Sequence, residues 1–294
     1  MANAVFTTSE SSAYNDQPEI RYHFPRTYLK QVEQSVGDWI VYYEPRRTSG
    51  PSSATGRQAY FAAAFVERVI ADPETSDHFY ALIKHYMELD KAVPFREGDH
   101  YFEALLRKDD GSTNKGAFGR SVRVIPKEEF EAVLRAGLSD APEPWESASE
   151  VRDEPANYPA RPIVERLQTR KYRDVAFRRH VRAAYDNTCA ITGLRLINGG
   201  GRPEVQAAHI WPVEHDGPDT VRNGLALTGT AHWLFDRGLL TVDESYRVCV
   251  ASKHLPSGLE SLINPGQTIR LPPHEHHWPH ANFLRWHREY RFKG

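Results

Sequence analysis

The stretch QAAHIWPVEHDGPDTVRNGLALTGTAHWLFDRG, residues 206–238, decides how the second half of the chain folds and which chemistry it can carry. It contains His209, then Asn223, then His232, with Asp236 four positions after His232. Side chains four positions apart lie on one face of a helix, as a pair of metal ligands requires. We therefore predict a short metal-binding helix around TAHWLFDRG, and a strand that ends at His209 and directs this side chain to the same place.

The segments around this stretch predict further elements of the same domain. CAITGLRLI (189–197), a triple-glycine turn and EVQAAHIWPV (204–213) together favour a hairpin. LLTVDESYRVCVA (239–251) favours another hairpin, and ANFLRWHREYRF (281–292) has the pattern of a closing amphipathic helix.

This combination of segments resembles the HNH nuclease family. The similarity lies in AAHI followed by proline, in NGLAL, and in H-x3-D followed by glycine, with CAITG and RGLL beside them, and it covers about residues 175–245. The resemblance implies a ββα-metal fold. It also implies that His232 binds one divalent cation with Asp236 beside it, and that Asn223 braces the His209 loop by hydrogen bonds.

The residues suit hydrolysis of a phosphodiester bond. Neutral imidazole at His209 can act as general base near pH 7, and Mg²⁺ or Mn²⁺ can polarise the phosphate. One position departs from the family pattern, because many HNH enzymes carry a metal ligand where this chain has Ala208. Asp236, Gln206 or water would have to replace that ligand. The cysteine pairs that bind zinc in many HNH proteins are missing too, so we expect no structural zinc.

Composition excludes several other classes of protein. The chain has 294 residues and only two cysteines, Cys189 and Cys249, which excludes a disulfide-framed module and an all-cysteine zinc site. No apolar run approaches the ~20 residues of a membrane span, and the first residues lack a secretory pattern. We therefore expect a cytoplasmic protein without a membrane partner.

Charge is distributed unevenly along the chain. Residues 1–138 carry 17 basic and 20 acidic side chains, residues 139–160 carry 1 and 6, and residues 161–294 carry 19 and 13. The proline-rich segment 139–162 is typical of a linker, so we predict domains at 1–138 and 163–294. A basic second domain next to an acidic linker favours a polyanionic partner, namely DNA.

Basic side chains concentrate in two segments that could contact DNA phosphates. The pattern of residues 163–186 predicts a long helix with an apolar face and a basic outer face, and residues 46–57 predict a polar loop. The outer face of the helix would carry Arg166, Arg170, Lys171, Arg173, Arg178, Arg179 and Arg182. Among all these groups, the phosphate contacts we expect are Arg46, Arg47, Arg170, Lys171, Arg178 and Arg179.

The first domain reads as strands with some helix, so the whole chain is predicted to be α+β. Segments 38–44, 57–72 and 120–125 favour strands, 76–90 is ambiguous between strand and helix, and KEEFEAVLRAG after Pro126 favours a helix. GDWIVYYEP and the segment that ends in DKAVPF make residues 10–137 resemble the EVE branch of the PUA-like superfamily. That resemblance implies a small β-barrel with flanking helices and a pocket for a flipped, modified base.

Aromatic faces stack on a flipped base, and a polar group can read its edge. Two clusters near the start of the chain offer both kinds of group, SAYNDQPEIRYHFP (12–25) and GDWIVYYEPRR (37–47). The pocket residues that we expect from them are Tyr14, Asp16, Tyr22, Trp39 and Tyr43.

The combination resembles EVE–HNH modification-dependent restriction endonucleases. This implies that the first domain reads 5-methyl- or 5-hydroxymethylcytosine in double-stranded DNA and that the HNH domain cuts nearby. Two alternatives stay open: an HNH nickase or nuclease whose first domain binds another ligand or unmodified DNA, and a non-enzymatic reader of modified DNA. One HNH site cuts one strand, and we expect a homodimer to break a duplex.

Overall fold

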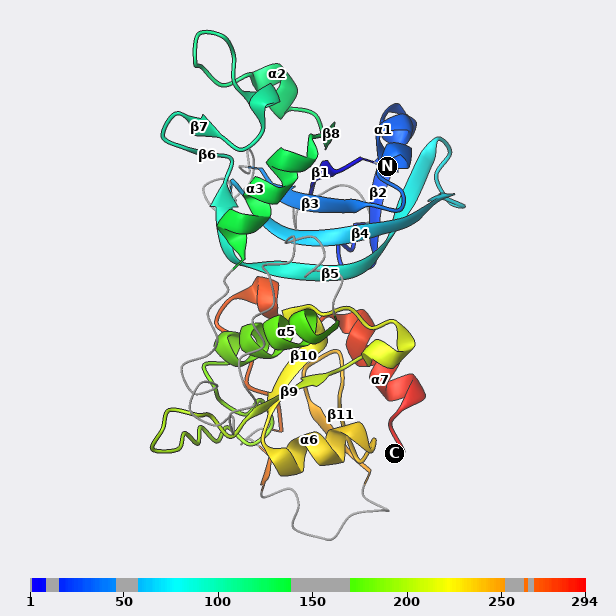
Figure 1. Cartoon of the computed structure of the whole chain (residues 1–294). Coiled ribbons are helices and arrows are strands. Elements are labelled where there is room, and N and C mark those ends of the chain that lie inside the picture. Colours follow the sequence, from blue (N-terminus) through cyan, green and yellow to red (C-terminus); the bar gives the residue numbers. More distant parts are fainter. Residues whose placement is uncertain (1, 9–15, 46–57, 139–169, 252–261, 264–266) are drawn as a thin grey trace. The chain divides into compact units, whose positions relative to one another are not determined.

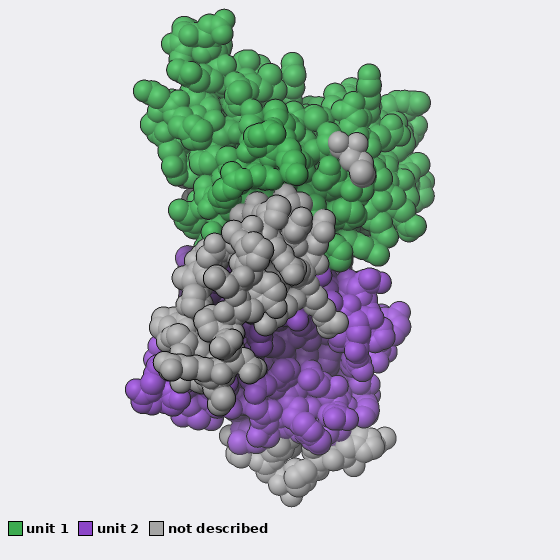
Figure 2. Space-filling model, viewed as in Figure 1, with its two compact units in different colours: residues 1–140, 161–168 green, residues 141–160, 169–294 purple. Residues whose placement is uncertain are grey.

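The chain divides into two compact units. The computed structural model describes residues 2–8, 16–45, 58–138, 170–251, 262–263 and 267–294, without the side chains of 170–172. Unit 1 comprises residues 1–140 and 161–168, and unit 2 comprises residues 141–160 and 169–294 (Figure 2). The expected linker, residues 139–162, lies outside the described residues. No described helix has the length and the apolar character needed to cross a lipid bilayer.

A six-stranded sheet forms the centre of unit 1, in the order β2-β5-β4-β3-β1-β8 (Figure 1). Its neighbours are antiparallel except β1 and β3, which run parallel. The strands are β1 (Ala4–Thr7), β2 (Arg21–Pro25), β3 (Trp39–Glu44), β4 (Ala59–Ala71), β5 (His78–Pro94) and β8 (Val122–Val124), and β6 (Arg96–Glu97) pairs with β7 (His100–Tyr101). The helices are α1 (Leu29–Gln34), α2 (Lys115–Phe118) and α3 (Lys127–Gly137), with short 3-10 helices at Arg26–Tyr28 and Ala104–Leu106.

The mixed helix and strand content is as expected, and the sheet curls into a half-barrel. β2 and β8 are its two ends, and no pairing between them exists among the described strands. The long strands β4 and β5 shift register at three places, and such bulges bend a sheet and increase its twist. The ambiguous segment 76–90 belongs to β5, so it is strand. The EVE-like assignment of unit 1 stays a prediction.

Both faces of β3 are covered, because its six residues are all buried. Ile40 and Tyr42 belong to the core on the concave side, whereas Val41 points to the opposite face, since successive side chains of a strand alternate. On α3, Gly137 permits close approach to β5: a Cβ at this position would lie 2.7 Å from a methyl carbon of Leu89.

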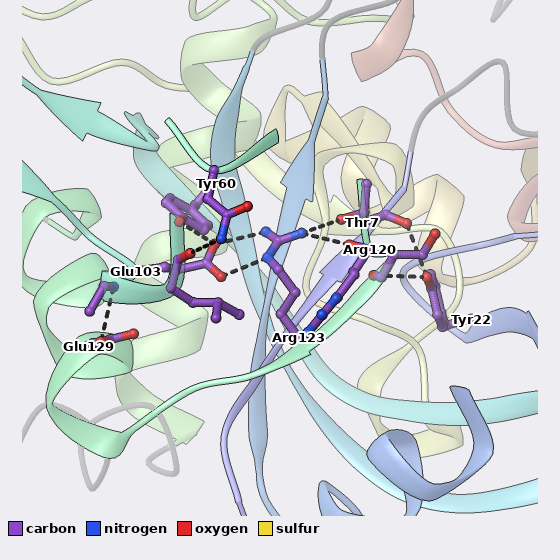
Figure 3. Close-up of polar contacts among 11 residues, drawn as sticks. Thr7, Tyr22, Tyr60, Glu103, Arg120, Arg123 and Glu129 are labelled. Carbon is purple, nitrogen blue, oxygen red and sulfur yellow. Dashed lines mark hydrogen bonds and ion pairs between the residues drawn. The ribbon is translucent and has the colours of Figure 1, made fainter. Parts of the chain in front are cut away.

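A buried ion pair links β8 to the loop before α2 (Figure 3). Arg123 donates to both carboxylate oxygens of Glu103, at 2.7 and 2.8 Å, and the hydroxyl of Tyr60 donates to Glu103 at 2.6 Å. Burial, followed by the Glu103 charge, raises the pKa of Tyr60 well above its ordinary value. Every oxygen of this buried carboxylate is therefore satisfied, so the cluster stabilises the edge of the sheet.

Unit 2 surrounds a two-stranded ladder with helices. Its elements are α5 (Arg170–Ala184), β9 (Gln206–His209), β10 (Gly224–Leu227), α6 (Gly229–Asp236), β11 (Leu240–Val242), β12 (Val248–Val250) and α7 (Ala281–Tyr290), with 3-10 helices at Val213–His215, Val221–Asn223 and Glu275–His277. The hairpin predicted for 239–251 is present as β11 and β12. The closing helix is present as α7, which buries Phe283 and Leu284.

The hairpin predicted from residues 189–213 is present only as a short turn. An antiparallel bridge joins Ile197 to Pro203, with backbone hydrogen bonds from Asn198 to Arg202 and from Glu204 to Leu196, and β9 pairs with β10. The reason is burial: β10 offers Leu225 and Leu227, which are fully buried, whereas Leu196 stays half exposed. The long helix is described from Arg170 onward, and residues 163–169 lie outside the described part.

Candidate active site

His209 lies at the end of β9, directly opposite Gly224 of β10. Gly224 lets α5 pack against this pair, because a Cβ there would collide with the side chain of Val181 and lie 3.1 Å from the ring of Phe177. As a result, the Phe177 ring stacks on the His209 ring, with centroids 3.7 Å apart and planes inclined by 10°. The helix thus covers one face of the imidazole and restricts its rotation.

The imidazole also contacts a buried carboxylate. Nε2 of His209 lies 3.0 Å from Oδ1 of Asp219, and Nε of Arg173 donates to Oδ2 of the same carboxylate at 3.3 Å. The side chains of Asp219 and Arg173 are only 5% and 7% exposed. The two charges therefore face each other inside the protein, next to the His209 ring.

Asn223 is fully buried and holds the loop between β9 and β10. Its Oδ1 accepts from the backbone N–H of Trp211 at 2.8 Å, and its Nδ2 donates to the carbonyls of Trp211 and Pro218, both at 2.9 Å. All of its polar capacity is directed at the loop that follows His209. The same loop carries Asp219, the residue after Pro218.

α6 supplies the pair of side chains predicted to hold a metal. Nε2 of His232 lies 3.3 Å from Oδ2 of Asp236, and Nδ1 of His232 lies 2.7 Å from Oε1 of Gln206. Nδ1 donates to the amide oxygen of Gln206, which only accepts. Nε2 of His232 and the Asp236 carboxylate face each other, so a divalent cation would bind between them by displacing the proton that they otherwise share.

These two side chains fit a divalent cation with an incomplete protein shell. Within the described ranges, no three His, Cys, Asp or Glu side chains are grouped so that they could hold a metal ion. Water and phosphate would have to supply the other ligands, as is common for Mg²⁺. Gln206 hydrogen-bonds to His232, so it would orient this ligand without itself binding the metal. Ala208, at the position where many HNH enzymes carry a ligand, is fully buried.

His209, His232 and Asp236 line one open cleft of about 820 Å³ within unit 2. Its wall carries a set of basic side chains, Arg178, Arg237, Arg291 and Lys293. His287 also lines the cleft, and burial lowers its pKa to about 4. Asp174, Glu214 and Asp236 line the same cleft, and Glu214 pairs with Arg291, so Arg178, Arg237 and Lys293 are the basic groups that could meet an anionic polymer there.

Several predicted DNA contacts lie outside the described residues. These are Arg46 and Arg47, in the 46–57 segment, and the side chains of Arg170 and Lys171 on α5. Arg178 is exposed and lines the cleft, and Arg179 is half buried on the same helix.

The residues expected to form the base pocket do not gather in one place. Tyr22 packs in the concave core and its hydroxyl donates to the carbonyl of Thr7 at 3.1 Å. Trp39 and Tyr43 alternate with Ile40 and Tyr42, so they project from the other face of β3. Of the four expected aromatic residues, the three that the structure describes, Tyr22, Trp39 and Tyr43, are buried as core residues. Tyr14 lies outside the described residues.

Asp16, the remaining expected pocket residue, is engaged by its own unit. It accepts from the backbone N–H of His23 at 2.7 Å and from the hydroxyl of Thr8 at 3.3 Å.

Sequence reasoning missed three side chains around His209. Arg173 was assigned to the basic outer face of the helix, but it is buried. Phe177 was expected on the apolar face of the helix, where nothing in the sequence distinguishes a ring that stacks on His209 from an ordinary core residue. Asp219 offered the clearest signal, because an acid four positions before Asn223 falls in the loop that returns to His209.

Comparison with known proteins gives one match in sequence. The family described as HNH endonuclease matches residues 189–243, which include His209, Asn223, His232 and Asp236. No curated protein matches the chain at a significant level.

Solved structures give weaker likenesses. The chain is similar to the modification-dependent TagI restriction endonuclease, with 14% identity, a TM-score of 0.32 and coverage of 97% of this chain and 80% of that one. It is also similar to the N-terminal domain of Staphylothermus marinus McrB, with 13% identity, a TM-score of 0.31 and coverage of 46% and 94%. At such TM-scores, neither likeness carries an argument about this chain.

Proposed function

We propose, from the match of residues 189–243 to the HNH endonuclease family, that the chain is a modification-dependent DNA endonuclease. Unit 2 hydrolyses a phosphodiester bond with a one-metal site, and unit 1 reads a flipped, modified cytosine. The observation that carries the proposal is the cleft of unit 2, which a histidine base candidate and a His–Asp pair line together with Arg178, Arg237 and Lys293.

In the proposed reaction His209 is the general base. It removes a proton from a water molecule whose oxygen then bonds to phosphorus, while the bond from phosphorus to the 3′ oxygen breaks. The leaving oxygen takes a proton from solvent, so the products are a 5′-phosphate and a 3′-hydroxyl. Arg178 and Arg237 hold the neighbouring phosphates in the cleft by charge.

His232 and Asp236 would hold the divalent cation, Mg²⁺ or Mn²⁺. When bound, the cation supplies polarisation of the scissile phosphate and stabilisation of the developing negative charge on the leaving oxygen. Gln206 keeps His232 in the tautomer that leaves Nε2 available, and Asn223 keeps the loop after His209 in place.

The reader function of unit 1 is supported by one polar cluster on the concave side of the sheet. The hydroxyl of Tyr42 makes no hydrogen bond with the residues that the structure describes. Burial raises the pKa of Tyr42 well above its ordinary value, and the nearby carboxylates of Asp16 and Glu19 raise it further. Carboxylates accept from the exocyclic amine of cytosine, so this cluster is where we propose that a base edge is read.

Assembly follows from the single site of the proposed nuclease. One base and one metal cut one strand, so we propose that two copies pair to break a duplex. Sedimentation of the free protein should show a dimer, and a supercoiled plasmid with one modified site should become linear. A persistent monomer that yields only nicked circles would contradict the dimer.

Digestion of matched DNA tests the proposed function. The same plasmid is prepared with cytosine, 5-methylcytosine or 5-hydroxymethylcytosine and incubated with the full chain in Mg²⁺ or Mn²⁺. We expect cleavage of at least one modified plasmid, none of the unmodified one, and none in EDTA. Equal cleavage of all three would support a nuclease whose first unit binds something other than a modified base.

A further inference from the structure

We infer that Asp219 and Arg173 are positioning residues for DNA cleavage, because together they hold His209 in the tautomer that can accept a proton from water. The inference rests on the proposed role of His209 as general base. It concerns the orientation of this ring only, and it is independent of which DNA unit 1 selects.

The first step is the direction of the hydrogen bond between His209 and Asp219. A carboxylate can only accept, so the 3.0 Å contact requires that Nε2 of His209 carries the proton. Nδ1 of the neutral ring then holds the lone pair, and it makes no hydrogen bond with the described residues. Since His209 lines the cleft, Nδ1 is the atom that can take a proton there.

Arg173 decides which oxygen of Asp219 serves the ring. Its Nε donates to Oδ2 at 3.3 Å, which leaves Oδ1 for His209. Guanidinium groups have no acceptor and keep their charge, so Arg173 gives the buried carboxylate the positive partner that it needs. Arg173 and His209 therefore donate to different oxygens of Asp219, as both the distances and the donor and acceptor roles of the groups require.

Two further contacts hold the triad in place. Asn223 donates to the carbonyl of Pro218, so it fixes the backbone immediately before Asp219. Phe177 covers one face of the His209 ring and lies one helical turn after Arg173 on α5. α5 thus supplies both Phe177, which restricts rotation of the His209 ring, and Arg173, whose charge holds Asp219 in place.

Replacement of Asp219 by asparagine tests whether this carboxylate sets the tautomer of His209. In Asp219→Asn, the amide oxygen must face Arg173, because Arg173 can only donate. The amide NH₂ then faces His209 and donates to Nε2, which moves the ring proton to Nδ1. We expect kcat to fall by about 10²- to 10⁴-fold, as for wrong-tautomer variants of other histidine bases, with little change in DNA affinity.

A second substitution should repair the first. In the double variant Arg173→Met with Asp219→Asn, nothing obliges the amide oxygen to face α5, so it can turn and accept from Nε2 of His209. We expect kcat of the double variant to exceed that of Asp219→Asn by at least about tenfold. If Asp219 and Arg173 merely stabilised the fold, the second substitution would lower activity further, and that result would overturn the inference.

The ring tautomer gives a direct readout that needs no DNA. Nitrogen-15 NMR of the full chain, with the His209 signals identified by their loss in His209→Ala, should show an Nε2–H ring in the parent chain. Asp219→Asn should show an Nδ1–H ring, and the double variant should return toward Nε2–H. An Nε2–H ring in Asp219→Asn, or an Nδ1–H ring in the parent chain, would overturn the inference.

Asp186→Asn is the matched control. Asp186 is an exposed aspartate of unit 2 that pairs with Arg195, and its backbone has a positive φ that asparagine also tolerates. We expect this variant to keep the parent tautomer and activity. Because the tautomer is measured without substrate, failure to cut modified DNA selectively would contradict the proposed function and leave this test intact.

Discussion

Gln206 is the residue on which the metal site can be tested without removing a ligand. It accepts the Nδ1 proton of His232 and so keeps Nε2 free for a cation. We predict that Gln206→Ala raises the Mg²⁺ or Mn²⁺ concentration for half-maximal cleavage by about 10- to 100-fold, with kcat at saturating metal retained within a few-fold.

Gln206→Glu is the control for this prediction, because it keeps an oxygen that accepts from Nδ1. It should need no more metal than the parent chain. Metal titrations of plasmid cleavage measure both variants, and an unchanged metal requirement in Gln206→Ala would show that Gln206 does not orient the ligand.

Spacing, residue types and the flanking segments together gave the resemblance that singles out His209, Asn223, His232 and Asp236, which lie on a strand, in a loop and on one helical turn. The same reasoning could not place Asp219, because its position depends on the conformation of a loop that Asn223 stabilises by a hydrogen bond to the carbonyl of Pro218. The burial of Trp39 and Tyr43 has a simpler reason: aromatic residues on a strand pack into whichever core the sheet covers.

The contact between α5 and β10 is tested by Gly224. In Gly224→Ala, the new methyl group collides with Val181 and pushes on Phe177, so α5 must move away from His209. We predict a loss of about 1–3 kcal/mol in unfolding free energy, as for overpacked cores, together with reduced kcat. Denaturant unfolding and cleavage rates measure these two effects.

Gly229→Ala is the matched control at the start of α6. A Cβ there meets only Glu204 Oε1 at 3.5 Å, an ordinary contact, and alanine favours the helix. Its stability should equal or exceed that of the parent chain. Equal stability of Gly224→Ala and Gly229→Ala would contradict the close packing of α5.

α7 is attached to the domain through a buried neutral histidine. The Nδ1 atom of His287 lies 2.8 Å from the Thr241 hydroxyl, Nε2 lies 3.2 Å from the carbonyl of Phe235, and burial lowers the pKa of His287 to about 4. A histidine of the unfolded chain titrates near ~6.5. The unfolded state therefore takes up protons first as the pH falls, and stability is lost between pH 6.5 and about 4.

We predict that this histidine accounts for on the order of 2–3 kcal/mol of unfolding free energy lost over that interval. His287→Gln should be less stable at pH 7.5 but should lose stability less steeply on acidification. His215→Gln, which alters an exposed ring, should follow the parent slope. Parallel slopes for the parent and His287→Gln would contradict this assignment.

At the level of elements, the sequence predicted those with strong local signals. β3, β4, α3 and α7 were found where periodicity and capping indicated them. The pairing of β9 with β10 was not predicted, because the choice between β10 and the apolar segment 189–197 depends on which of them the helices bury. The exact curvature of the sheet was not predictable from local patterns either, since bulges in β4 and β5 bend it.

For the whole molecule, the two units predict separable functions. Residues 1–138 contain every strand of the six-stranded sheet, together with α3. We predict that this fragment folds alone and binds a duplex with one modified cytosine more tightly than the same duplex without it. Equal affinity for both duplexes, measured by fluorescence anisotropy on a fragment with a cooperative unfolding transition, would contradict the reader function.

The most direct test of the whole proposal is a competition in one tube. Two duplexes of identical sequence, one with 5-methylcytosine and one without, carry different fluorophores and are cut by the full chain in Mn²⁺, with His209→Ala as the inactive control. We predict preferential cutting of the modified duplex by at least about tenfold, and no cutting of either by the variant. Equal cutting of both duplexes, or undiminished cutting by His209→Ala, would contradict it.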